Sequence, residues 1–149
     1  MSDRAAWRSR LLVSAQATGI LGCVYPFSSA SRGSIYLLGA SVAGLALGAA
    51  TVWHNRLGNF GIFPEPRPAT VLVTSGPYRL IRHPMYVALL LTMIGIALYR
   101  LHPLNLAALG LVTAAVVAKS RLEERYLGAR FREYAAYRAR TKRFVPYLW

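Results

Sequence analysis

Four apolar segments, separated by short basic stretches, divide this chain of 149 residues. They cover about residues 11–27, 34–53, 84–99 and 104–118. A helix needs about 17–25 mostly apolar residues to cross the hydrocarbon core of a bilayer. The second segment meets this length, whereas the third and fourth are short and are joined by a tight turn over residues 100–103. We therefore expect four helices, the last two of which form a hairpin.

Basic residues fall mainly on one side of this arrangement. The chain has 18 Lys and Arg residues against 5 Asp and Glu residues. If the four segments are spans and the N-terminus is cytoplasmic, all the basic residues except Arg32 and Arg100 are cytoplasmic. Membrane proteins follow this positive-inside rule, whereas a soluble bundle has no reason to alternate its charges. We therefore predict an all-α, polytopic membrane helix bundle of about four transmembrane helices, in a bacterial inner membrane with both termini cytoplasmic.

The composition argues against several other classes of protein. The basic residues lie between long apolar runs and form no continuous stripe, so we expect membrane lipids and no nucleic acid as partners. Cys23 is the only cysteine, which excludes an intramolecular disulfide, and no metal-ligand spacing is present. Small residues at Ala40, Gly44 and Gly48 permit close helix packing, either within the chain or in a homo-oligomer. The stripe itself does not choose between them.

The residues after the fourth segment predict one more helix. Leu127, Phe131 and Tyr134 share one face of a helix over residues 119–140. Its flanks are basic, so we expect a C-terminal cytoplasmic amphipathic helix that lies on the membrane or folds back over the preceding loop. Glu123 and Glu124 lie near its start. They are either solvated carboxylates neutralised by neighbouring basic residues or one half of a binding site.

The segment from residue 76 to 86, GPYRLIRHPMY, concentrates polar groups at the start of the third apolar run. Proline suits the first position of a helix, so we expect the helix to begin at Pro84 with His83 at the cap position. A helix N-terminus attracts anions, and Arg79 and Arg82 add positive charge beside it. These arginines either help to hold a carboxylate or phosphate, or simply anchor the helix at the lipid headgroups.

The loop before this segment contains the proline-rich stretch FPEPRP over residues 63–68. Its prolines favour a stiff, extended backbone and forbid helix. It is either a rigid connector or one wall of a site with Glu65 facing inward.

Two motifs, separated by the hairpin, carry a family resemblance. The first is Gly-Pro-Tyr-x-x-x-Arg-His-Pro-x-Tyr over residues 76–86. The second is Glu-Glu-x-x-Leu-x-x-x-Phe-x-x-Tyr-x-x-Tyr over residues 123–137, followed by Arg-Phe-Val-Pro over 143–146. Over roughly residues 60–147 the chain resembles the isoprenylcysteine carboxyl methyltransferase and phospholipid methyltransferase superfamily. Arg132 departs from the pattern, because the family often has glycine there.

The resemblance implies an integral membrane methyltransferase that uses S-adenosylmethionine and lacks a Rossmann fold. It implies one domain over 1–149, with a two-span scaffold over 1–53 and the cofactor-binding catalytic region over 54–149. The implied cofactor-binding residues are Tyr78, Arg82, His83, Pro84, Tyr86, Glu123, Glu124 and Tyr137. The implied catalytic residues are Glu124, Arg130, Tyr134 and Arg138. In this assignment the start of the third helix holds the cofactor's carboxylate, the glutamates hold its ribose or ammonium group, and tyrosine rings contact its adenine or sulfonium.

The expected methyl acceptor is a lipophilic or lipid-modified molecule that enters from the bilayer. An acceptor carboxylate needs only orientation, for which Arg130 or Arg138 is available, whereas an amine needs a base such as Glu124 or Glu133. A thiol acceptor is also open. A sterol-reductase-like enzyme that binds NADPH shares the Arg-His-Pro-x-Tyr element, and a non-catalytic basic membrane scaffold shares the charge pattern. The Glu-Glu motif and the short chain favour the methyltransferase.

Overall fold

The computed structural model describes residues 3–28, 31–55, 59 and 61–146. Its α-helices are α1 (Asp3–Val24), α2 (Leu38–Asn55), α3 (Pro84–Arg100), α4 (Pro103–Arg130) and α5 (Tyr134–Arg140). Two short 3-10 turns, η1 (Ile35–Leu37) and η3 (Gly76–Arg79), precede α2 and α3. No strand occurs within these ranges, and an isolated bridge joins Ile81 to Lys142. The predicted all-α fold is confirmed.

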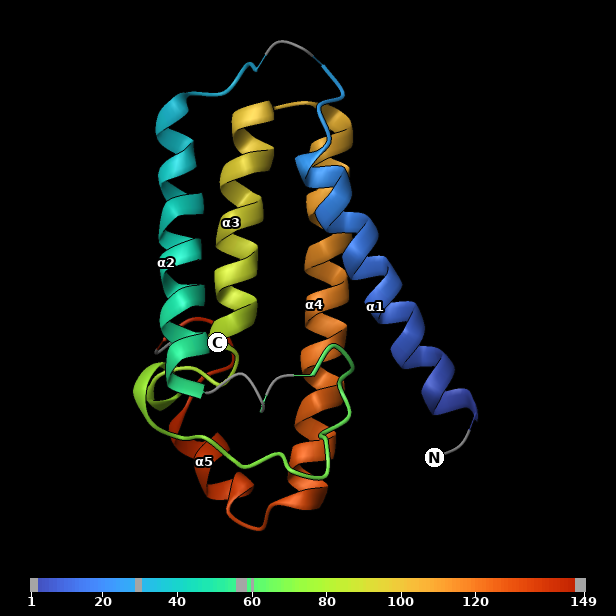
Figure 1. The fold of residues 1–149 in the computed structure, drawn as a ribbon, viewed down its shortest axis with the longest axis vertical. Helices are drawn as coiled ribbons and strands as arrows, with labels where there is room; N and C mark the ends of the chain where they lie inside the picture. Colours follow the sequence, from blue (N-terminus) through green and yellow to red (C-terminus); the bar gives the residue numbers. More distant parts are fainter. Residues whose placement is uncertain (1–2, 29–30, 56–58, 60, 147–149) are drawn as a thin grey trace.

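The four long helices run alternately in opposite directions and form two closely packed pairs (Figure 1). α2 packs along α3, and α1 packs along α4, whereas the two pairs contact each other less. Glycine permits the close approach in the first pair. A Cβ at Gly44 would lie 2.5 Å from Oγ1 of Thr92 and 2.6 Å from the carbonyl oxygen of Ala88. The small-residue stripe on α2 therefore serves packing against α3 within the chain.

Local sequence signals set the ends of α3 and the start of α4. Pro84 is the first residue of α3 and His83 is its cap residue, as predicted. The helix ends where Leu101 adopts the left-handed conformation, with φ 48°, and donates its N–H to the carbonyl oxygen of Ala97. His102 caps α4 by accepting the N–H of Leu104 at 3.3 Å. The tight turn expected between the two helices is therefore present.

The prediction of one separate helix over residues 119–140 is wrong, because residues 119–130 belong to α4. α4 continues for 28 residues to Arg130, and α5 follows as a separate helix of seven residues. The apolar run stops at residue 118, but the residues that follow include lysine, leucine, glutamate and arginine, which all favour helix. A change in hydrophobicity therefore marks a change of environment along one continuous helix.

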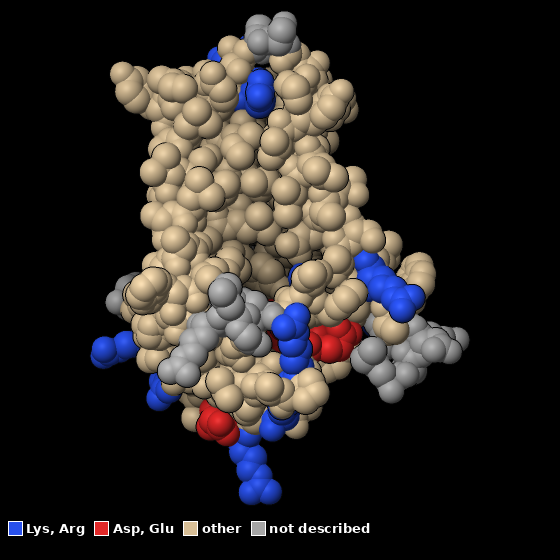
Figure 2. Space-filling model, viewed as in Figure 1, with Lys and Arg blue, Asp and Glu red and all other residues tan. Residues whose placement is uncertain are grey.

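The exterior of the bundle indicates membrane association. Two helical stretches are long and apolar enough to cross a bilayer, Ile35–Asn55 and Pro103–Arg130, whereas α3 is apolar but has 17 residues. Large apolar side chains such as Leu21 and Val42 are exposed, at 70% and 66% of their surface. Lys and Arg side chains gather at the end that holds α5, beyond an almost uncharged belt (Figure 2).

Candidate active site

The site is built where the start of α3 meets the segment after α5. Arg82 donates its backbone N–H to the carbonyl oxygen of Lys142 at 2.8 Å, and His83 donates to that of Arg143 at 3.2 Å. The Arg82 guanidinium also donates from Nη1 to the carbonyl oxygen of Thr141. The C-terminal segment thus takes up two N–H groups that a bound anion would otherwise receive at the helix start.

Glu124 lies at the centre of an ion-pair cluster. Its Oε1 atom lies 2.8 Å from Nε of Arg82 and 3.3 Å from Nε2 of His83, and its Oε2 atom lies 2.8 Å from Nη2 of Arg143. The carboxylate side chain is only 5% exposed. Charge-assisted hydrogen bonds of this kind are strong, and together they join α3, α4 and the C-terminal segment. Glu124 is therefore held as a carboxylate between three cationic partners.

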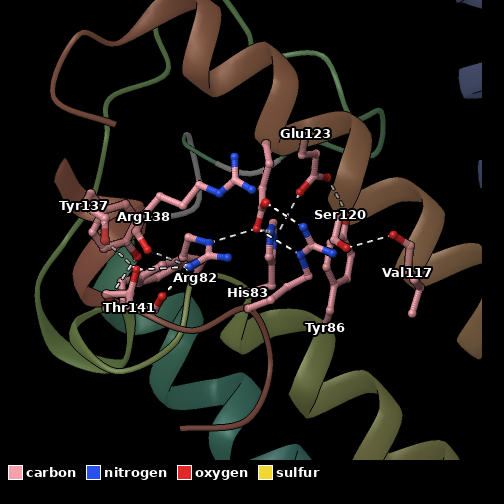
Figure 3. Close-up of polar contacts among 12 residues, drawn as sticks. Arg82, His83, Tyr86, Val117, Ser120, Glu123, Tyr137, Arg138 and Thr141 are labelled. Carbon is pink, nitrogen blue, oxygen red and sulfur yellow. Dashed lines mark hydrogen bonds and ion pairs between the residues drawn. The ribbon is translucent and has the colours of Figure 1, made fainter. Parts of the chain in front are cut away.

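Glu123, the residue before Glu124 on α4, faces a different set of groups (Figure 3). Its Oε1 atom accepts a hydrogen bond from the Tyr86 hydroxyl, and its Oε2 atom lies 3.5 Å from Nδ1 of His83. His83 is thus placed between two carboxylates. Burial alone would lower the pKa of His83, but the hydrogen bonds and charges of Glu123 and Glu124 outweigh it and raise this pKa. The two carboxylates therefore favour the protonated form of the histidine.

A cavity of about 590 Å³ opens beside this cluster, at the boundary between the apolar belt and the charged end. The hollow is visible in Figure 2 between the two helix pairs. Side chains from every α-helix line it, together with η3 and the loop before it. Pockets that bury a small molecule measure about 300–1,000 Å³ and combine apolar walls with a few polar groups. This cavity has that size and character.

Residues 63–67 of the proline-rich stretch line the cavity, as expected if this stretch forms one wall of a site. Glu65 lines the cavity and accepts a hydrogen bond from the Ser9 hydroxyl of α1. On the other side, the exposed Arg130 guanidinium donates to the carbonyl oxygen of Arg67 at 3.0 Å and to that of Pro68. The wall is therefore fastened to both α1 and the end of α4.

Three tyrosines line the same cavity near α5. The Tyr78 hydroxyl accepts Nδ2–H of Asn55 at 2.9 Å, and the Tyr137 hydroxyl donates to the carbonyl oxygen of Tyr78 at 2.8 Å. Burial raises the pKa of Tyr137 to about 12, so its hydroxyl remains protonated. The Tyr134 hydroxyl is buried and has no hydrogen-bond partner among the described residues.

Lys119 adds a buried cation to the wall formed by α4 and α1. It is only 4% exposed, and its Nζ atom donates to Oε1 of Gln16 at 3.1 Å. The ammonium lies 5.6 Å from the centre of the Tyr86 ring, within the range of a cation–π contact. Lys119 and Gln16 were not among the residues implied by the sequence. Lys119 lies four residues before Glu123 on the same helix face, which is the signal that was available.

The structure brings most of the residues implied by the sequence into one place. The cavity is lined by Tyr78, Arg82, His83, Tyr86, Glu123, Tyr134 and Tyr137. Pro84 is buried at the helix start, and Glu124 lies behind the cavity in its ion pairs. Arg130 and Arg138 are exposed and are not among the lining residues. Within the described ranges, no group of three or more His, Cys, Asp or Glu side chains is placed to hold a metal ion.

A model of the phospholipid methyltransferase family matches residues 34–134, which is more than half of the chain. The chain belongs to the phospholipid methyltransferase family. The resemblance inferred from the two motifs is thereby confirmed. The match spans α2, α3 and α4 and ends at the first residue of α5, whereas α1 lies outside it.

Two curated relatives are resistance proteins by name. The chain is 42% identical over 88 residues to the cobalt-zinc-cadmium resistance protein CzcN of Cupriavidus metallidurans, over 58% of this chain and 41% of that protein. It is 32% identical over 112 residues to the nickel-cobalt-cadmium resistance protein NccN of Alcaligenes xylosoxydans xylosoxydans, over 72% of this chain and 52% of that protein. The chain spans about half the length of the curated relatives it matches. No solved structure matches it.

Proposed function

We propose that this chain is a membrane methyltransferase that uses S-adenosylmethionine and methylates a lipophilic or membrane-associated acceptor. The observation that carries the proposal is the cavity, which combines carboxylates, cations and four tyrosines in one space. Membership of the phospholipid methyltransferase family supports methyl transfer as the reaction. We also propose four spans in a bacterial inner membrane with both termini cytoplasmic, because the basic side chains gather at the end that holds the cavity.

The side chains of the cavity suit the groups of this cofactor, which has an ammonium, a carboxylate, a sulfonium, ribose hydroxyls and adenine. Glu123 offers carboxylate oxygens to an ammonium or to hydroxyl groups, and Arg82 offers a guanidinium to a carboxylate. Tyr78 and Tyr137 offer ring faces to adenine or to the sulfonium cation. The buried Tyr134 hydroxyl, which lacks a partner in the described ranges, would gain one from the ligand.

Glu124 has a different role in this proposal from Glu123. Both of its oxygens are already bonded to cationic side chains, so it holds Arg82 and His83 in position and does not act as a base. Glu123 accepts the Tyr86 hydroxyl and faces the cavity, so it is the carboxylate that contacts the cofactor. Arg130 is assigned to holding the proline-rich wall, because its guanidinium donates to two carbonyl oxygens there.

S-adenosylmethionine supplies an electrophilic methyl group when it is bound. An acceptor held beside it would take that methyl group, and S-adenosylhomocysteine would be left in the cavity. The protein accelerates this displacement mainly by holding the acceptor atom in line behind the methyl group. A carboxylate acceptor becomes a neutral ester with no proton transfer. An amine or thiol acceptor must also lose a proton, for which Glu123 is a carboxylate available in the cavity.

Ligand binding to the purified protein in detergent tests this assignment. S-adenosylhomocysteine should bind the wild type and Glu133→Gln equally, because Glu133 is exposed. It should bind Glu123→Gln at least about tenfold more weakly, because a charge-assisted hydrogen bond is lost. Isothermal titration with NADPH serves as the comparison. Tight binding of NADPH without S-adenosylhomocysteine would favour a reductase and contradict the proposal.

A further inference from the structure

Lys119 is a cavity cation that no carboxylate neutralises directly. Its one hydrogen bond in the described part of the chain goes to the neutral Gln16 amide. Glu123 and Glu65 attract it through space, but neither lies within 4.0 Å of its Nζ atom among the described salt bridges. An ammonium has three N–H donors, so two remain for a partner outside these contacts. A buried lysine in an apolar helix bundle is costly and usually marks a functional site.

The balance of charge around the cavity points to the kind of partner. Four cationic side chains are buried or half-buried here, against three carboxylates: Arg82, His83, Lys119 and Arg143 against Glu65, Glu123 and Glu124. Glu123 and Glu124 are engaged with Arg82, His83 and Arg143, and none of the described salt bridges includes Lys119, so its ammonium has no direct counter-charge. The proposed cofactor has two positive groups and one negative group, so it adds a further positive charge. A second, anionic ligand would offset part of this excess positive charge in the partly enclosed space.

The wall beside Lys119 suits a hydrocarbon chain. Val13, Ala17 and Ile20 of α1 line the cavity on either side of Gln16. Ala17 and Ile20 follow Gln16 along α1, away from the end that holds α5, whereas Val13 precedes it. An amphiphile would place its charged group at Lys119 and its tail along these residues. α1 lies outside the matched family region, so the family match does not account for this wall.

We propose that Lys119, oriented by Gln16, binds an anionic group of the lipophilic acceptor, and that α1 forms the surface for its apolar chain. The proposal rests on the methyltransferase function, since it assigns the acceptor side of that site. It names the acceptor class as an amphiphilic anion, and it makes Lys119 an acceptor-binding residue.

Competition against a bound fluorescent fatty acid, cis-parinaric acid, tests the acceptor class on the full-length protein in neutral detergent. Laurate, dodecanol and dodecylamine have similar tails and differ in the charge of the head, and each is used below its micelle concentration. Laurate should displace the probe at least about tenfold more strongly than the other two. Inorganic phosphate should not displace it, because it has no tail. A wild type that does not prefer laurate, or that releases the probe equally to phosphate, overturns the proposal.

Variants separate a binding role of Lys119 from a structural one. Lys119→Met should lose about 10–100-fold of laurate affinity and keep its dodecanol affinity, whereas Lys119→Arg should retain most of both. Arg121→Met is the matched control, because Arg121 is an exposed cation two residues along α4. Equal laurate binding by Lys119→Met and wild type would refute the role. Binding of S-adenosylhomocysteine is measured in parallel. If the wild type does not bind it, the proposed function is refuted, whereas the preference for laurate tests the anion subsite separately.

Discussion

Replacement of Glu124 by glutamine is expected to destabilise the fold more than any other single change to a carboxylate. The neutral amide keeps the size of the side chain but removes the charge that Arg82, His83 and Arg143 share. Their contacts with the Glu124 oxygens measure 2.8–3.3 Å, and the carboxylate is 5% exposed. Three cationic groups would then remain close together without their common counter-charge. The joint between α3, α4 and the C-terminal segment should open first.

The expected magnitude follows from the burial of the cluster. Removing one partner of a buried ion pair costs about 3–5 kcal/mol. For a chain of this length, 1 kcal/mol corresponds to about 2–4 °C in Tm, so Glu124→Gln should lower Tm by about 6–20 °C. Thermal unfolding in detergent, followed by circular dichroism, measures this. Arg143→Met should be destabilising as well. The loss of stability in the double variant should be much smaller than the sum of the two single losses.

The matched control is Glu133→Gln, since Glu133 is an exposed carboxylate nine residues further along the chain. It should change stability by no more than about 0.5 kcal/mol. Glu124→Gln unfolding within about 2 °C of the wild type would refute the claim that this carboxylate holds the three elements together.

Three further predictions concern other parts of the fold. Because the pKa of His83 is raised, its contribution to stability is fully present below its unfolded-state value of about 6.5 and is lost as pH rises through the folded value. The free energy of unfolding should therefore fall more steeply toward alkaline pH in the wild type than in His83→Gln. Parallel pH dependence in the two proteins would count against the two-carboxylate arrangement. Gly44→Ala should cost about 1–3 kcal/mol in chemical unfolding, because its Cβ would meet Thr92 and α3 backbone, whereas Gly39→Ala, with open space around it, should not. Arg130→Ala should speed hydrogen exchange over residues 63–70 with little change in Tm, and unchanged exchange would show that the proline-rich wall is held otherwise.

Local signals in the sequence predicted much of the fold. Proline at position 84 and the turn over 100–103 set helix ends through backbone sterics alone, and these do not depend on distant residues. The apolar segments predicted the four long helices for another reason, because an apolar run in a bilayer must satisfy its backbone hydrogen bonds internally. The length of α4 was missed, because the change from apolar to polar residues near 118 alters the surroundings of the helix without breaking its hydrogen bonds.

The site was predicted less completely, because side-chain direction depends on how the helices pack. Glu123 and Glu124 are adjacent in sequence but about 100° apart around α4, so one faces the cavity and the other faces Arg143. Nine basic residues follow position 118, and the sequence does not say which of them reaches Glu124. The pairing of Lys119 with Gln16 joins residues that are 103 positions apart. Only the packing of α1 on α4 makes that contact visible.

Transfer of a labelled methyl group from S-adenosylmethionine to a membrane extract tests the central claim most directly, because it reports the reaction and its acceptor together. The purified protein should label a lipophilic product, and mass spectrometry of that product should show a gain of one methyl group. Glu123→Gln should label it at least about tenfold more slowly at limiting cofactor concentration, and Glu133→Gln should match the wild type. The absence of any labelled product from a folded protein that is supplied with cofactor and extract would contradict the account.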